Sequence, residues 1–395
     1  MILSELNKGI YYVGVNDRTS SLFESLWSLP AGVSYNSYIV KGDKTALIDT
    51  VHISKAKNFI ANIKTAIGES PIDYVVINHM EPDHSGAIDY IVKSFPDVTI
   101  VGNKKTIEMV EGFYGSISNT KVINDGDVLD LGDGKSLKFV ITPMVHWPET
   151  MMTFEQSSST LFSGDAFGCF GALNGGVIDA ECDVESYIPE MYRYYAAIVA
   201  KYGTFVIKAI EKLKGLRINR ICPTHGPVWQ DYMMHVIDLY DRLAHFTPQN
   251  GAVIVYGSMY GNTEDIAELI ARELTVNGVS VRMHNIATAD LSVVLADIMR
   301  FKGLIIGAPT YNSSIFPPIQ NLIEAIVSRG IKNRVLSTFG SYTWGPGISV
   351  KIEKSFESLN YDTVSCKIEM KQSILDNDLY NRIEEFAKVF AEKVK

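Results

Sequence analysis

Four potential metal ligands lie within six positions of this chain, at His79, Glu81, Asp83 and His84. The segment before them, residues 72–77, is apolar and β-branched, which predicts a buried strand that ends where the ligands begin. Histidine and carboxylate suit zinc, iron or manganese, and this stretch has no cysteine for a thiolate zinc site. One histidine at a strand end is usually a surface residue. This density of ligands, in a chain with eight histidines, instead predicts a metal centre.

Three later strand ends carry residues of the same type. Segments 137–141, 160–163 and 218–222 read as strands, and a His or Asp follows each of them beside glycine or proline. These residues are His146, Asp165 and His225. Taken alone, an aspartate after a strand is more often a turn or helix cap than a ligand. Because several strand ends can meet at one rim of a sheet, the set as a whole favours a shared site.

This series resembles the metallo-β-lactamase superfamily, whose hydrolases carry an H-x-H-x-D-H motif followed by His, Asp and a final His. Here the motif reads H-x-E-x-D-H from residue 79, so Glu81 stands at the position of the second histidine. A carboxylate there makes the site harder and more anionic, which favours a redox-active iron pair over zinc. Together with Pro82 and the Ser85-Gly86 pair, this pattern is similar to the flavodiiron proteins specifically.

The resemblance implies a ligand set for two irons. One iron is expected to bind His79, Glu81 and His146, the other Asp83, His84 and His225, with Asp165 bridging the two.

Aromatic residues near these ligands are candidates for the pocket wall. Residues 187–214 read as helix, and the aromatic run 192–195 has core packing as its simplest role. One of Tyr194 or Tyr195 is nonetheless a candidate hydrogen-bond donor toward the metals, and Trp147 is a candidate wall residue beside His146.

The pattern changes at residues 246–251, a polar segment with proline and glycine. This change predicts two domains, residues 1–249 and residues 250–395, as expected for a chain of 395 residues. The first domain opens with predicted strands at 11–15, 35–40 and 45–49, with a tight hairpin at 41–44, and a helix at 52–67.

The second domain begins with an apolar strand at 251–256, a loop rich in glycine and hydroxyl groups at 257–263, and a helix at 264–275. This order is typical of a phosphate-binding cradle at a helix N-terminus, although such a loop can also merely cap its helix. It is neither a Walker loop nor a G-x-G-x-x-G loop.

Two more buried strands, 303–308 and 334–339, alternate with helical patterns and end in loops with aromatic residues. The alternation predicts a doubly wound parallel sheet that binds ligands at its carboxyl edge. The domain resembles flavodoxin, which implies FMN; Tyr260 replaces the middle threonine of the usual phosphate motif. The candidate FMN contacts are Ser258, Met259, Tyr260, Gly261, Asn262, Thr263, Pro309, Thr310, Tyr311, Asn312, Ser341, Tyr342, Trp344 and Gly345.

The flavodiiron resemblance covers nearly the whole chain. It implies an α/β and α+β fold, with a metallo-β-lactamase-like αββα sandwich followed by a flavodoxin-like domain. The implied activity is reduction of O₂ to water, of NO to N₂O, or of both, with FMN relaying electrons to the irons. It also implies a head-to-tail homodimer or a dimer of dimers. Because no CxxC pair is present for a rubredoxin site, an external donor such as rubredoxin is expected.

Composition excludes several classes of partner. A net charge of −9 argues against nucleic acid and anionic membranes. No apolar run approaches membrane-spanning length, and the N-terminus lacks signal-peptide features, so a cytoplasmic protein is expected. The four cysteines form no disulfide framework.

Two other functions stay open at this point. One is a binuclear zinc hydrolase with an appended flavodoxin module, which Glu81 disfavours and which would leave the flavin idle. The other is an electron carrier with a degenerate metal domain, which the seven filled ligand positions disfavour. Metal analysis of unsupplemented protein distinguishes zinc from iron.

Overall fold

The computed structural model describes residues 4–366 and 368–395, and the chain divides into two compact units. The first contains the chain up to Tyr194 together with Tyr202–Ala244, and the second contains Tyr195–Lys201 and His245–Lys395. The boundary predicted between residues 249 and 250 lies at the start of strand β17 (Gln249–Tyr256).

The first unit is built on two sheets. The larger sheet has the order β1 (Ser4–Asn7), β2 (Ile10–Tyr12), β7 (Tyr38–Lys41), β8 (Thr45–Ile48), β9 (Tyr74–Val76), β10 (Thr99–Gly102), β11 (Thr120–Val122). The smaller has the order β12 (Val128–Gly132), β13 (Lys135–Ile141), β14 (Met151–Glu155), β15 (Thr160–Gly164), β16 (Arg220–Pro223).

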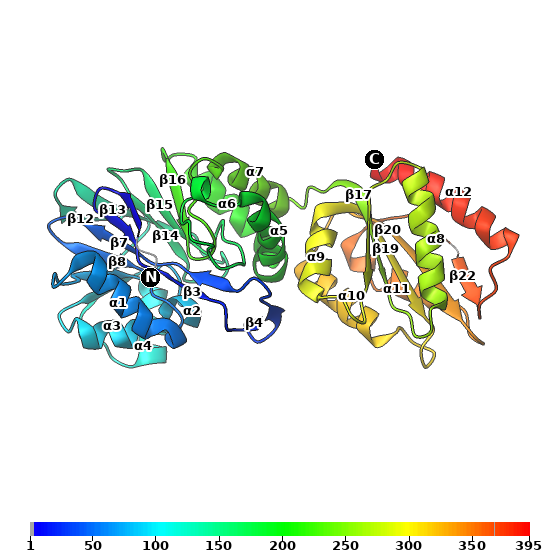
Figure 1. The fold of residues 1–395 in the computed structure, drawn as a ribbon, viewed down its shortest axis with the longest axis horizontal. Coiled ribbons are helices and arrows are strands. Elements are labelled where there is room, and N and C mark those ends of the chain that lie inside the picture. The colour runs from blue at the N-terminus through cyan, green and yellow to red at the C-terminus, as the bar shows by residue number, and fades with distance from the viewer. Residues whose placement is uncertain (1–3, 367) are drawn as a thin grey trace. The chain divides into compact units, whose positions relative to one another are not determined.

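Helices cover the outer side of each sheet (Figure 1). The larger sheet carries α1 (Ala56–Ile67), α3 (Ile88–Ser94) and α4 (Lys104–Tyr114), and the smaller carries α6 (Gly203–Leu213) and α7 (Met233–Ala244). The predicted αββα sandwich is therefore confirmed. Helix α1 shows why: Phe59, Ile63 and Ile67 form one buried face at helical spacing, and the helix ends at Gly68 with a positive φ of 63°.

The predicted strands that lead into the ligand loops are present as β9, β13, β15 and β16. Strand pairs β8–β9 and β15–β16 are parallel, so their carboxyl ends lie at the same rim of each sheet. Strands β7 and β8 pair antiparallel with Lys41 opposite Thr45, which confirms the predicted hairpin.

Several predicted elements were wrong in detail. The strand expected at 35–40 is divided between β6 (Val33–Tyr35) and β7, with Asn36 and Ser37 outside both strands. The strand expected at 11–15 is divided between β2, which pairs with β7 in the larger sheet, and β3 (Val15–Asp17), which pairs with β6 in a separate two-stranded sheet. The helix expected at 187–214 is interrupted. Helix α5 (Val184–Tyr194) leads into a π-helical segment (Tyr195–Val199) and a 3-10 turn (Ala200–Tyr202) before α6 begins. The Arg329 guanidinium bonds the carbonyls of Ala196 and Ala197 in that segment, which offers them partners outside the helix.

The second unit is a parallel sheet with the order β18 (Val281–Asn285), β17, β19 (Phe301–Pro309), β20 (Val335–Tyr342), β21 (Asp362–Thr363), with β22 (Ile368–Lys371) also paired to β20. Helices α9 (Leu291–Arg300) and α10 (Pro317–Arg329) lie on one side of the sheet, with α8 (Asn262–Val276) and α12 (Asn377–Val394) on the other (Figure 1). This arrangement confirms the predicted doubly wound, flavodoxin-like domain.

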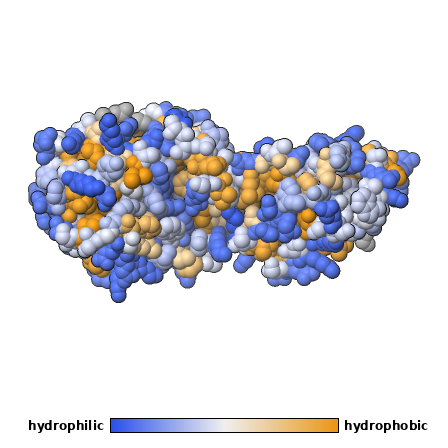
Figure 2. Space-filling model, turned by 90° about the horizontal axis from the view of Figure 1, so that it is seen from below, coloured by the Kyte–Doolittle hydropathy of each residue, from blue (hydrophilic) through white to orange (hydrophobic). Residues whose placement is uncertain are grey.

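The described part of the chain contains no helix long and apolar enough to cross a membrane. On the face drawn in Figure 2, polar residues predominate and apolar residues form small groups.

We predict that Gly307→Ala destabilises the second unit by about 1–3 kcal/mol, because the new methyl group would overlap the Phe339 ring inside the sheet. Urea unfolding followed by circular dichroism measures the loss. The control is Gly112→Ala on helix α4, where nothing lies within 4 Å and alanine is the better helix former. Equal effects of the two changes would contradict the packing seen at Gly307.

Candidate metal centre

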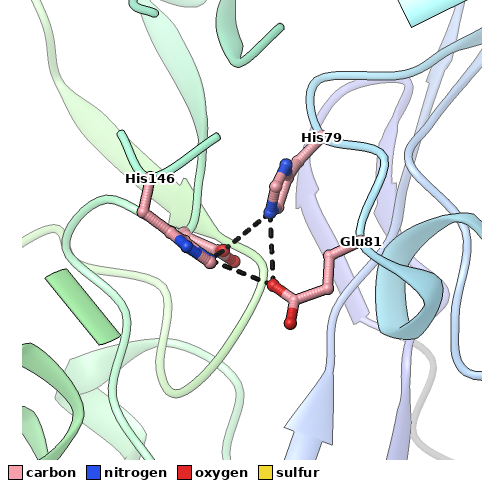
Figure 3. A group of neighbouring side chains, drawn as sticks. His79, Glu81 and His146 are labelled. Carbon is pink, nitrogen blue, oxygen red and sulfur yellow. Dashed lines mark hydrogen bonds and ion pairs between the residues drawn. The ribbon is translucent and has the colours of Figure 1, made fainter. Parts of the chain in front are cut away.

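The first cluster of candidate ligands combines three segments of the first unit. His79 and Glu81 follow β9, His146 lies between β13 and β14, and Asp165 follows β15. The Nε2 atoms of His79 and His146 lie 3.3 and 3.0 Å from Glu81 Oε2 (Figure 3), and 3.4 and 3.2 Å from Asp165 Oδ2. Four ligand atoms, one from each residue, therefore all lie within 4.8 Å of one another.

The second cluster contains Asp83 and His84, on the short helix α2 (Pro82–Ser85), and His225, which follows β16. Asp83 Oδ1 lies 3.3 Å from His84 Nε2, and Asp83 Oδ2 lies 3.2 Å from His225 Nε2. Asp165 Oδ1 lies 2.9 Å from His84 Nε2 and 3.7 Å from His225 Nε2. Asp165 thus presents one oxygen to each cluster, and all seven predicted ligands come together.

The buried polar atoms of these clusters test whether a metal pair fits. All seven residues are buried, the most exposed at 7%. Yet among the described residues no hydrogen-bond partner outside the ligand set is found for either oxygen of Asp83, either ring nitrogen of His84, Asp165 Oδ2 or His225 Nε2. Burying such groups without partners costs several kcal/mol in total. Cations between the carboxylates and the imidazoles would satisfy these atoms, so the residues fit two metal ions.

The charges of the clusters agree with this fit. Burial raises the pKa of Asp165, but His84 and His79 outweigh burial and bring it well below its usual range. Burial lowers the pKa of His84, but Asp83 and Asp165 outweigh it and raise that pKa to about 9. The pKa values of His79 and His146 are raised as well, so without metal these three imidazoles would take up protons to balance the carboxylates. Metal binding replaces these protons, as is general for histidine and carboxylate sites.

Polar residues around the ligands fix their orientation. Asp49 accepts hydrogen bonds from the Asn78 backbone and side chain at 2.7 and 2.9 Å, which holds the loop after β9. Thr224 donates to Asp165 Oδ1 at 2.6 Å, and the Ser34 carbonyl accepts from His225 Nδ1 at 2.7 Å. Such outer contacts select the ring tautomer that leaves Nε2 free for metal.

The aromatic candidates have different surroundings. The Tyr194 ring lies 5.5 Å from the His225 ring, and its buried hydroxyl has no hydrogen-bond partner among the described residues. Trp147 packs edge-on against His79, with ring centroids 5.2 Å apart. Tyr195 is also buried, but it belongs to the segment that groups with the second unit. Of the two tyrosines, Tyr194 is the better placed.

Two carboxylates at the centre were missed in the sequence. Glu149 is completely buried and accepts a hydrogen bond from His79 Nδ1 at 2.8 Å. Glu24, on the turn between β4 (Leu22–Phe23) and β5 (Trp27–Ser28), lies beside Glu81; burial and then repulsion from Glu81 raise its pKa to about 7. The only signal for Glu149 was a carboxylate three residues after the ligand His146. Glu24 carried none.

A cavity of about 300 Å³ lies at the carboxyl edge of the sheet in the second unit. It is lined by all the predicted FMN contacts except Gly261, and by Thr343 and Gln372, which were not predicted. Gly261 sits at the start of α8 with φ of 98°, a conformation that glycine adopts without strain.

The cradle has the geometry of an anion site. The first-turn amides of α8 point out of the helix end without intrahelical acceptors. The Thr263 hydroxyl is buried there and lies 2.8 Å from the Ser341 hydroxyl. The start of α8 and the end of β20 therefore meet at this point. Tyr260 and Trp344 are 90% and 87% exposed, which leaves their aromatic faces available at the rim. The residues fit a phosphate-bearing, planar ligand.

Known proteins with the same two-domain organisation resemble this chain. The model of the ODP family beta lactamase matches residues 33–226, and the flavodoxin model matches residues 254–386. An anaerobic nitric oxide reductase flavorubredoxin from Salmonella typhi is 33% identical over 364 residues, covering 90% of this chain and 76% of that protein.

Solved structures agree over the whole length. The rubredoxin oxygen:oxidoreductase of Desulfovibrio gigas has a TM-score of 0.93 at 27% identity, covering 100% of this chain and 98% of that one. A variant of the flavo di-iron protein of Thermotoga maritima has a TM-score of 0.90 at 28% identity, with coverage of 100% and 98%. The chain therefore belongs to the flavodiiron protein family.

Proposed function

We propose that this protein is a flavodiiron oxidoreductase that reduces O₂ to water, NO to N₂O, or both. The observation that carries this proposal is the convergence of two buried His–carboxylate clusters on the shared Asp165, with several ligand atoms that have no hydrogen-bond partner outside the clusters among the described residues. Glu81 in place of a histidine favours iron over the zinc of a hydrolase. The relatives are named as reductases of these two gases, which supports the same reading.

His79, Glu81 and His146 would hold one iron, Asp83, His84 and His225 the other, with Asp165 between them. When bound, the iron pair supplies a redox-active site for a diatomic gas. The three carboxylates neutralise three of the four positive charges of a ferrous pair. Trp147 and Phe23 pack against ligand histidines and exclude water, with ring centroids 5.2 and 5.5 Å from His79 and His225. The buried Tyr194 hydroxyl, whose ring packs against His225, is a candidate hydrogen-bond donor toward this site.

We propose that residues 1–249 form the metal domain and residues 250–395 the FMN domain. The cradle before α8 would hold the phosphate, and the loops after β19 and β20 would hold the ring system. FMN accepts and passes on electrons, and with the ferrous pair it supplies the four that reduction of O₂ to water takes.

Because the two sites lie in different units, we propose the family's head-to-tail homodimer, or a dimer of dimers, which serves the metals of one copy with the flavin of another. A rubredoxin or a similar small redox protein would reduce the flavin. We propose a cytoplasmic location and no nucleic-acid or membrane partner, in line with the net charge of −9.

The first prediction from this proposed function concerns which gas, O₂ or NO, is the substrate. Protein reduced without oxygen and then mixed rapidly with O₂ or NO should reoxidise its flavin faster than free FMN does under the same conditions. Fast reoxidation by one gas alone identifies the substrate, and comparable rates identify an enzyme for both. Rates no faster than free FMN with either gas would contradict the proposal.

The second prediction concerns Asp165. Asp165→Asn should remove most of the iron from both positions, because each carboxylate oxygen faces a different cluster. Iron per chain, measured by mass spectrometry of purified protein, checks this result. Asp179→Asn is the control: Asp179 is equally buried but bonds the amides of Gln230 and Tyr232. Full iron content in Asp165→Asn would exclude a bridging role.

The third prediction concerns the flavin. Thr263→Val keeps the side-chain volume but removes the buried hydroxyl at the cradle, and should weaken FMN binding about 10-fold, or about 1.4 kcal/mol. Flavin fluorescence quenching during titration of flavin-free protein measures the affinity. Thr275→Val, in the last turn of the same helix, should leave affinity unchanged. The same affinity in both variants would place the phosphate elsewhere.

A further inference from the structure

Glu149 is tied to the metal ligand His79 by direct contacts. Its Oε1 atom accepts hydrogen bonds from His79 Nδ1 at 2.8 Å and from the Met80 backbone amide at 2.9 Å. The Glu149 carbonyl in turn accepts from the side-chain amide of Asn103, the cap of helix α4. Glu149 is therefore held by the cap of helix α4 and by the ligand loop after β9. These contacts fix its orientation relative to the His79 ring.

The contact with Glu149 fixes the tautomer of the His79 ring. With Nδ1 donating to a carboxylate, the lone pair of His79 is at Nε2, the atom that faces Glu81 and Asp165 at 3.3 and 3.4 Å. A carboxylate partner also increases the basicity of the imidazole and makes it a stronger electron donor to a metal.

In the second cluster, no histidine donates from Nδ1 to a carboxylate in the described part of the chain. The His225 ring donates from Nδ1 to a neutral carbonyl, that of Ser34. The Nδ1 atom of His84 is buried and has no hydrogen-bond partner among the described residues. Of these three ligand histidines, only His79 is backed by a carboxylate outside the ligand set, so the two metal positions differ in charge and donor strength.

In the described structure, the negative charge of Glu149 pairs with no residue other than His79. Its ion-pair partner there is His79, and its Oε2 atom is buried without a hydrogen-bond partner. Two hydrogen bonds to Oε1 favour the ionised form. Three ligand carboxylates leave one positive charge of a ferrous pair unbalanced, and Glu149 supplies the fourth negative charge.

We propose that Glu149 is a positioning residue that orients His79 and stabilises the oxidised state of the iron held by His79, Glu81 and His146, so that this iron has the lower reduction potential of the two. The inference rests on the diiron site of the proposed function.

The test compares Glu149→Gln with the native holoprotein. Glutamine keeps an oxygen that accepts from His79 and Met80 but removes the charge, so the fold and the iron content should be retained. The potential of one iron couple, from a redox titration followed by electron paramagnetic resonance, should rise, because removal of a negative charge disfavours the ferric state. One of the two Mössbauer doublets of the ⁵⁷Fe-loaded ferrous protein should change and the other should not. The FMN potential should be unchanged.

Glu149→Ala removes the acceptor as well and should lower the affinity of one iron about 10- to 100-fold. The control is Glu155→Gln. Glu155 is another completely buried glutamate of the first unit, on β14, but it accepts from Ser157 and Ser158 and touches no ligand. Its replacement should leave iron content, potentials and both doublets at native values.

Native iron potentials and both native doublets in Glu149→Gln would overturn the proposal, as would equal shifts of both doublets or the same shifts in Glu155→Gln. A native protein that binds no iron would instead overturn the proposed function itself, so the two failures are distinguishable.

Discussion

The shared position of Asp165 between two buried clusters is the constraint on which the rest of the metal domain depends. Its two oxygens face different histidines, and it has to stay ionised although it is 2% exposed. In a medium of low dielectric constant, like-charged carboxylates around it repel strongly unless cations lie between them. The domain is thus organised to tolerate a high density of negative charge at one point, which is useful only if metal ions occupy that point.

The scaffold meets this demand by holding each ligand loop from outside. Asn36 is an example: its side-chain amide donates to the carbonyls of Pro223 and Gly226 at 2.9 and 2.8 Å, and its backbone amide donates to Thr224. The loop that carries His225 is therefore fastened to the segment that leads into β7 of the larger sheet, although it follows a strand of the smaller sheet. Rigid support of this kind lets ligands keep their geometry while the metals change oxidation state.

The parts that sequence reasoning predicted are those with a periodic or positional signal. The ligand positions followed from strand ends, and the cradle before α8 followed from a strand, a glycine-rich loop and a helix. Glu149, Gln372 and the π-helical segment at Tyr195–Val199 could not be predicted in this way. Each depends on a contact with a residue far away in the chain: Glu149 with His79, Gln372 with the carbonyl of Tyr342, and the π-helical carbonyls with Arg329. Local pattern carries no information about such partners.

The central claim is that two irons lie side by side in the first unit with Asp165 between them. Anomalous X-ray diffraction at the iron and zinc absorption edges, on crystals of protein grown without added metal, tests it most directly. The account predicts two iron peaks, one among His79, Glu81 and His146 and one among Asp83, His84 and His225, each in contact with an oxygen of Asp165. Two zinc peaks at these positions, or a single metal peak in fully loaded protein, would contradict it.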